Sequence, residues 1–79
     1  MNPRPVEVWP LDNFTLKVKF ANGDVRCFLA TAYLHYPAFH ALRDPGFFRQ
    51  CRVERGTVTW PDGTDFCPDT LYLESTPVT

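Results

Sequence analysis

The feature that most constrains this chain is a run of seven residues, 14–20, in which apolar and polar side chains alternate. Alternation with a period of two is the pattern of a strand that buries one face and exposes the other. Asn22-Gly23 follows this run, and the pair favours a type I′ turn because both central positions of that turn need a positive φ angle. The pattern therefore predicts a two-residue hairpin into a second strand over residues 24–29.

A two-residue turn decides which residues of the two strands face each other. The resulting pairs are Ala21 with Asp24, Phe20 with Val25, Val18 with Cys27, and Leu16 with Leu29. In this register one face of the hairpin is apolar. Phe28 is the exception, because it lies on the solvent face among three cationic side chains, those of Lys17, Lys19 and Arg26.

A second hairpin is predicted around Arg55-Gly56, between residues 51–54 and 57–60. Its turn pairs Val53 with Val58 and Cys51 with Trp60, so that all four share one apolar face. An earlier strand over residues 6–9 alternates as well. It is expected to end at Pro10, which has no backbone N–H to give to a central ladder.

Between the hairpins, prolines indicate short helices. Thr31 is expected to cap a helix over residues 32–36, and Pro37 ends it and begins the next, over residues 38–43. Asp44-Pro45 repeats the pattern of a cap followed by proline, and Cys67-Pro68 opens a helical turn over residues 67–72.

The order of these elements predicts an α+β fold. It consists of a small antiparallel sheet, built from two hairpins plus an N-terminal strand, with short helices between the hairpins and a C-terminal helical turn. A chain of 79 residues is too short to bury two cores, so residues 1–79 are expected to form a single domain. Residues 1–5 and 75–79 are expected to be flexible ends.

Charge and hydropathy exclude several classes of protein. Eight Lys and Arg against nine Asp and Glu give a net charge of −1, so nothing attracts a polyanion, and nucleic-acid binding is disfavoured. No apolar run is long enough to span a bilayer, and the first residues lack the apolar core of a signal peptide. We therefore expect a cytoplasmic protein with no membrane partner.

Several short motifs occur in a fixed order along the chain. They are Asn22-Gly23 between two strands, Tyr36-Pro37-Ala38-Phe39, Leu42-Arg43-Asp44-Pro45, Phe48, Trp60-Pro61-Asp62-Gly63-Thr64-Asp65 and Leu71-Tyr72. With them the chain resembles, over nearly its whole length, the bacterial domain of unknown function family 2442 (DUF2442). The resemblance implies a small α+β domain with an antiparallel sheet and no established activity. Some relatives are joined to helix-turn-helix domains or encoded beside another small protein, which implies by analogy a regulatory or partner-binding role.

Acidic and histidine side chains do not form a recognisable metal motif. Asp62, Asp65 and Asp69, with Asp12 as a further candidate, lack the order of a calcium loop, and are typical of turns and of the first turn of a helix. His35 and His40 are five residues apart with Pro37 between them, so they cannot share a helix face as paired ligands do. Neither a metal nor another cofactor is expected.

Thiol chemistry is an alternative to a binding role. Cys27 and Cys51 fall on the predicted apolar faces, where a thiol behaves as a small hydrophobe. Cys67 differs, because a helix N-terminus lowers the pKa of a thiol there, and this makes Cys67 the candidate reactive thiol. The single serine, Ser75, lies in the expected tail, so a serine hydrolase has no nucleophile.

The favoured function is a non-enzymatic module that binds another protein or a second copy of itself, as a homodimer, with a small metal- or thiol-dependent enzyme as the alternative. The candidate binding residues are Phe28, Trp9, Lys17, Lys19 and Arg26, and the exposed edge of strand 6–9 is a second candidate interface. Exposed aromatic side chains often anchor interfaces. Trp60 and Phe66 are instead expected to complete the core.

Overall fold

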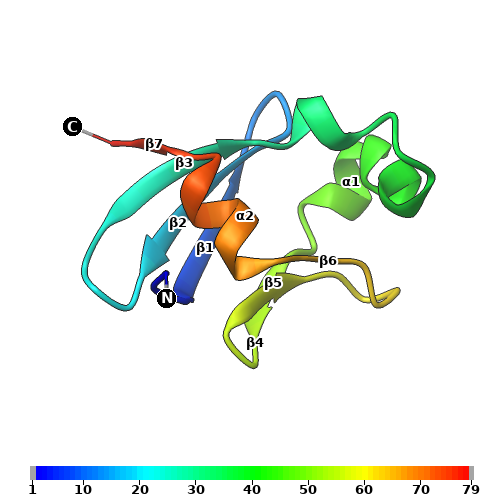
Figure 1. Cartoon of the computed structure of the whole chain (residues 1–79). Helices are drawn as coiled ribbons and strands as arrows, with labels where there is room; N and C mark the ends of the chain where they lie inside the picture. The colour runs from blue at the N-terminus through cyan, green and yellow to red at the C-terminus, as the bar shows by residue number, and fades with distance from the viewer. Residues whose placement is uncertain (1, 79) are drawn as a thin grey trace.

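Two antiparallel sheets form the framework of the chain in a computed structural model that describes residues 2–78 (Figure 1). The first sheet has the order β1-β2-β3-β7, with β1 at Pro5–Leu11, β2 at Thr15–Phe20, β3 at Val25–Leu29 and β7 at Thr76–Pro77. The second has the order β4-β5-β6, with β4 at Arg52–Glu54, β5 at Thr57–Thr59 and β6 at Asp65–Phe66. With the short helices described below, these sheets confirm the predicted α+β class.

The first hairpin differs from the prediction by one residue. Its loop holds three residues, because the Phe20 N–H donates to the carbonyl of Asp24 (2.8 Å) and the Gly23 N–H donates to the carbonyl of Phe20 (2.9 Å). Of the loop residues 21–23, only Gly23 has a positive φ, of 92°. This is the geometry of a type I turn followed by a left-handed glycine, rather than the predicted type I′ turn.

One extra loop residue turns every side chain of β3 to the opposite face. The observed pairs are Leu16 with Phe28, Lys17 with Cys27, and Val18 with Arg26. The predicted register was therefore wrong, as was the placement of Phe28 on the solvent face. Phe28 is fully buried, whereas Leu29 is 61% exposed.

The second hairpin confirms its predicted register. Val53 pairs with Val58, and both residues of the turn, Arg55 (φ 54°) and Gly56 (φ 74°), have the positive φ angles of a type I′ turn. β1 is longer than predicted, because it continues through Pro10 to Leu11. Proline is tolerated there because β1 is an edge strand and pairs on one side only.

The helical elements lie close to their predicted places. η1 is a 3-10 helix at Ala30–Tyr33, which begins before the predicted cap Thr31, and η2 is a 3-10 helix at Pro37–Arg43. α1 at Pro45–Phe48 begins after Asp44, whose carboxylate accepts a hydrogen bond from the Gly46 N–H (3.0 Å). α2 at Pro68–Leu73 begins after Cys67.

Residues near both ends of the described chain make contacts with the first sheet. Pro5 is buried and pairs with Phe20, and the Val78 N–H donates to the carbonyl of Val25 (3.0 Å) beside β7. Ser75 is only 8% exposed. Met1 and Thr79 lie outside the described residues.

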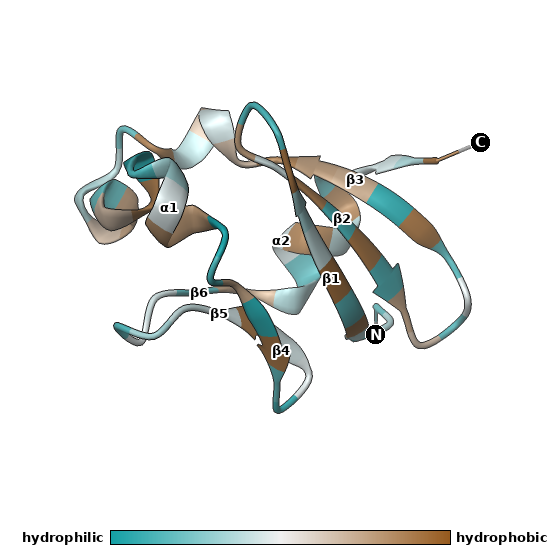
Figure 2. Cartoon of the chain, turned by 180° about the vertical axis from the view of Figure 1, so that it is seen from behind, coloured by the Kyte–Doolittle hydropathy of each residue, from teal (hydrophilic) through white to brown (hydrophobic). Residues whose placement is uncertain are grey.

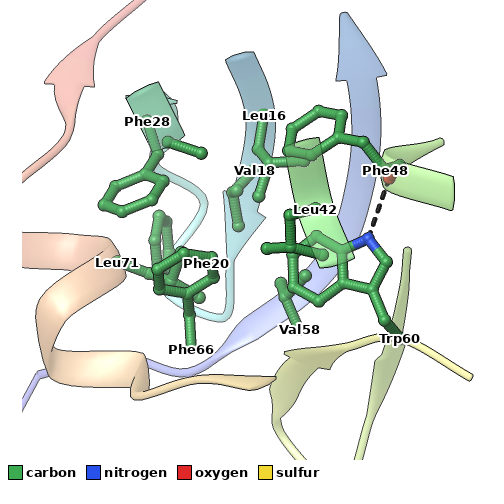
Figure 3. Packing of buried hydrophobic residues seen from close by; sticks show 11 residues of the cluster. Leu16, Val18, Phe20, Phe28, Leu42, Phe48, Val58, Trp60, Phe66 and Leu71 are labelled. Atoms are coloured by element: carbon green, nitrogen blue, oxygen red, sulfur yellow. Dashed lines mark hydrogen bonds between the residues drawn. The ribbon is translucent and has the colours of Figure 1, made fainter. Parts of the chain in front are cut away.

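The two sheets and the helices share one hydrophobic core (Figure 3). Its fully or nearly fully buried members are Leu16, Val18, Phe20, Phe28, Ala30, Leu42, Phe48, Val58, Trp60, Phe66 and Leu71. The expectation that Trp60 and Phe66 complete the core is confirmed. The one polar atom of the Trp60 ring is satisfied, because its Nε1 donates to the carbonyl of Phe48 (2.9 Å), and this bond links the residue after β5 to α1. Among residues 2–78, no helix is long and apolar enough to cross a membrane.

Candidate functional site

The side of the first sheet that faces away from the core, called the outer face below, is the candidate functional surface. α2 lies in front of this sheet in Figure 1 and behind it in Figure 2, so it covers one face only. The observed registers place three rows of side chains on the outer face: Glu7, Lys19 and Val25; Trp9, Lys17 and Cys27; Leu11, Thr15 and Leu29.

Large apolar side chains are exposed on this face. Trp9 and Leu11 are each 39% exposed, and Leu29 is 61% exposed. Lys17 lies beside Trp9, with its Nζ 5.4 Å from the centre of the ring, within the range of a cation–π contact. Contiguous apolar groups on a surface mark interaction sites more often than isolated ones do. Three of the predicted binding residues, Trp9, Lys17 and Lys19, thus lie together on the outer face. Leu11 and Leu29 also lie there, but the sequence analysis did not predict them as binding residues.

The other two predicted binding residues lie on the inner face. Phe28 is in the core, stacked on Tyr33 with 5.4 Å between ring centres. Arg26 is half-buried, with its Nε and Nη2 donating to the side-chain and backbone oxygens of Ser75 (2.8 Å each) and its guanidinium 4.7 Å from the centre of the Tyr72 ring. Their predicted place on the solvent face was wrong, for the reason of register given above. Arg26 holds the C-terminal segment against the sheet instead.

Asp24 completes this contact between the hairpin and the C-terminal segment. The Tyr72 hydroxyl donates to its carboxylate (2.6 Å), and the Asn22 side-chain amide donates as well (3.2 Å). The Tyr72 hydrogen bond is the main cause that lowers the pKa of Asp24, with smaller contributions from Asn22 and the nearby Arg26 charge. These groups stabilise the fold and are not free to bind a ligand.

The three thiols lie in different surroundings. Cys27 is half-buried on the outer face, not on the apolar face predicted for it. Cys51 is half-buried, and burial raises the pKa of its thiol to about 11. Cys67 is exposed and lines a cleft of about 410 Å³ whose walls are mainly aromatic: Tyr33, Tyr36, Phe39 and Phe66.

Of the acidic residues considered as metal ligands, Asp62 and Asp65 border one shallow cavity, whereas Asp12 and Asp69 make contacts elsewhere. Asp62 accepts a hydrogen bond from the Thr64 N–H (2.9 Å) within its turn, and this bond lowers the pKa of Asp62. Asp69 accepts one from the side chain of Asn2, and Asp12 forms an ion pair with Arg49 (2.6 Å). No group of three His, Cys, Asp or Glu side chains within residues 2–78 is arranged to hold a metal ion.

The two histidines lie together at the surface. The His40 Nε2 is 3.3 Å from the backbone carbonyl of His35, and the His35 ring packs against Tyr36 with 4.1 Å between ring centres. Both histidines are exposed. The contacts of both rings are local, within residues 35–40.

The residue in the sequence that could have indicated the observed register is Asn22, in the loop of the first hairpin. The Asn22 Oδ1 accepts a hydrogen bond from the Asp24 N–H (3.0 Å), an Asx turn that favours the three-residue loop. An Asn-Gly-Asp sequence therefore allows two loop lengths. Only the longer of them places Trp9, Leu11, Lys17 and Leu29 on one face.

Comparison with known proteins agrees with the resemblance noted in the sequence. The model of a family described as "Protein of unknown function (DUF2442)" matches residues 5–77, nearly the whole chain. No curated protein and no solved structure is significantly similar to the chain.

Proposed function

The chain belongs to the DUF2442 family, and we propose that it functions as a non-enzymatic module that binds another protein through the outer face of its first sheet. The observation that carries the proposal is the asymmetry of this sheet. Its inner face is covered by α2 and the core, whereas its outer face leaves Trp9, Leu11 and Leu29 in contact with solvent.

The physical reason is the cost of hydrating apolar surface. Removing apolar area from water contributes about 25 cal/mol per Å², and a partly exposed tryptophan offers a large area of this kind. Trp and Tyr are enriched among the residues that dominate binding energy at interfaces. A partner that covers Trp9 and Leu29 therefore gains more here than on a mixed polar surface.

The proposed regulatory role is that the chain changes the activity of its partner protein by binding to it through the outer face. The buried Phe28 takes no part, and neither does Arg26, whose guanidinium is held by Ser75 and Tyr72. Binding is expected to depend on Trp9, Leu11 and Leu29, with Lys17 and Lys19 beside them.

Affinity capture with paired variants tests the proposal. The purified chain is used as bait in an extract of its native host, beside Leu29→Ser and the control Leu73→Ser. Leu73 is a suitable control because it is the same residue type and is 64% exposed, against 61% for Leu29, but lies on α2. A protein retained by the wild type and Leu73→Ser and lost with Leu29→Ser supports binding at the outer face. Retention by all three baits contradicts it.

A thiol-dependent enzyme is the second candidate, favoured by one observation. The exposed Cys67 borders the aromatic cleft, where an apolar substrate has room to bind next to the sulfur. The rate of Cys67 alkylation at pH 7 separates the candidates, since a nucleophile reacts faster than free cysteine. Cys51 is the internal reference, because a pKa of about 11 leaves roughly one thiol in ten thousand ionised at that pH.

A further inference from the structure

The aromatic cleft next to Cys67 is a second site, whose lining residues belong to η1, η2, β6 and α2 or adjoin them. None of them lies on the outer face, so this site is independent of the proposed function. The cleft has a volume of about 410 Å³, within the range of about 300–1,000 Å³ that small-molecule sites cover. Its inner wall is fixed by the core, because Phe66 is 2% exposed and Tyr33 stacks on the buried Phe28. Tyr36, which is 49% exposed, forms the outer wall.

The rings around the cleft differ in orientation. The Tyr33 ring stands nearly perpendicular to Phe39 (86°) and to Phe66 (81°), and the Tyr36 ring is tilted by 39° from Tyr33. Phe39 and Phe66 are parallel (8°) and stack directly, with 4.5 Å between ring centres. A flat ligand therefore cannot be sandwiched between these two rings, because they already occupy each other's faces. A rounded group, which several differently oriented rings can contact at once, fits this lining better.

The charges that surround the cleft are negative. Glu74 lies one helical turn after Thr70, which lines the cleft, and residues four apart share a helix face. Burial raises the pKa of Tyr33, and the negative charge of Glu74 raises it further. Asp62 and Asp65 border a shallow cavity that shares part of its wall with the cleft. In the part of the chain that the structure describes, no Lys or Arg lines either cavity.

We propose that the cleft binds an alkylated ammonium cation, such as the trimethylammonium group of choline or of a methylated lysine side chain. Aromatic rings attract cations electrostatically, and groups of rings recognise quaternary ammonium ligands in this way. The carboxylates around the cleft add an attraction that a neutral apolar ligand of the same shape does not receive. An unmodified lysine ammonium is strongly hydrated, so it loses more when aromatic walls replace its water.

An NMR titration of the isotope-labelled chain with choline tests the proposal. The reference ligand is neohexyl alcohol, the uncharged isostere in which carbon replaces the ammonium nitrogen. We expect choline to shift the amide resonances of residues 33–39 and 66–70, and to bind about fivefold or more tightly than the isostere. This preference should decrease at high salt, because Asp62, Asp65 and Glu74 are exposed and their charges are screened.

A peptide with one trimethyllysine and the same peptide unmethylated identify the source of the cation. Methylated peptide that binds more tightly than choline indicates a modified protein, and the reverse order indicates a small metabolite. The unmethylated peptide should bind more weakly than the methylated one in either case.

Two pairs of variants locate the binding site. Tyr36→Leu removes an exposed ring but keeps an apolar side chain, and it should weaken choline binding about threefold or more, whereas Tyr36→Phe keeps the ring and should change it little. Glu74→Gln should weaken binding about twofold, as loss of one exposed charge does. Glu7→Gln should leave it unchanged, because Glu7 is an exposed carboxylate on the outer face.

Equal affinity for choline and neohexyl alcohol would overturn the proposal, because the cleft would then be a general apolar site. Choline binding that Tyr36→Leu does not weaken would overturn it too, as would shifts confined to residues outside the cleft or no shift at the highest choline concentration. None of these results bears on binding at the outer face, which Leu29→Ser tests separately.

Discussion

At Gly23 the backbone has a φ of 92°, a conformation that costs residues with a Cβ roughly 1–2 kcal/mol. Space is not the constraint, because a Cβ built at Gly23 would meet no atom within 4 Å. The need for glycine at this position is therefore one of backbone conformation alone. Gly46 offers the contrast, since its φ is not positive and a Cβ there would only touch the Asp44 carboxylate at an ordinary 3.5 Å.

Two glycine substitutions should consequently change stability in opposite directions. Gly23→Ala should lower the free energy of unfolding by about 1–2 kcal/mol, because alanine is strained at this φ. Gly46→Ala, inside α1, should raise it by about 0.4–1 kcal/mol, because alanine restricts the unfolded chain more than glycine does. Urea unfolding of both variants measures the difference. A midpoint of Gly23→Ala that does not fall would contradict the loop geometry described for the first hairpin.

At the scale of the element, the three-residue loop decides which face of β3 enters the core. Phe28 lies next to Leu16 and packs edge-on against Phe66, with ring centres 5.0 Å apart. Leu29 faces solvent beside Thr15. With a two-residue loop Leu29 would be buried and Phe28 exposed. With the observed three-residue loop Phe28 is buried and Leu29 lies on the outer face.

Alanine substitutions at these two neighbouring positions test the register. Phe28→Ala should cost about 3–5 kcal/mol of unfolding free energy, as deletion of a buried aromatic side chain does. Leu29→Ala should change it by less than about 0.5 kcal/mol, as is usual at an exposed site. The register with a two-residue turn requires the reverse order. Thermal or urea unfolding of the pair therefore distinguishes the two registers directly.

At the scale of the whole molecule, contacts between the first hairpin and the C-terminal segment fix the last residues. Asp24 binds the Tyr72 hydroxyl, and Arg26 binds Ser75, so residues about fifty positions apart are held together. β7 follows directly and pairs with β3. Residues 72–77 are thus held against the first sheet by tertiary contacts.

These contacts predict a dependence of stability on pH. The Tyr72 hydrogen bond lowers the pKa of Asp24 in the folded chain, whereas the unfolded carboxyl titrates near its ordinary value of 3.8. The stabilisation is thus fully present above that value and is lost as the pH falls through the lowered pKa of the folded state. The difference in unfolding free energy between the wild type and Tyr72→Phe should be constant above pH 5 and shrink below pH 4.

Denaturant unfolding of both proteins from pH 2 to pH 7 measures this difference. The lowered pKa of Asp62 affects the two proteins equally and cancels in the comparison. Asp24→Asn is the control, because in its background Tyr72→Phe should give a difference that does not change with pH. A wild-type difference that is flat over the whole range would show that the Tyr72–Asp24 bond does not depend on ionisation of Asp24, and would contradict the lowered pKa.

The sequence by itself determined the elements and one of the two hairpin registers. Alternation located β1 to β5 but not the two-residue strands β6 and β7. Prolines located η2, α1 and α2, and Arg55-Gly56 led to the correct pairing of Val53 with Val58. Lys17 and Lys19 could be assigned to one face because they lie two residues apart on the same strand, whereas the pairing of Trp9 with Lys17 required the structure.

Only the tertiary structure decided the register of the first hairpin, and with it the composition of the outer face. Asn22-Gly23 is compatible with loops of two lengths, because a type I′ turn and a three-residue loop with a left-handed glycine are both common in hairpins. The observed register buries Phe28 in place of Leu29, and the Phe28 ring packs against Tyr33 and Phe66. The local sequence does not choose between the two loops, so the register follows the core, and the core is assembled from segments that no local pattern connects.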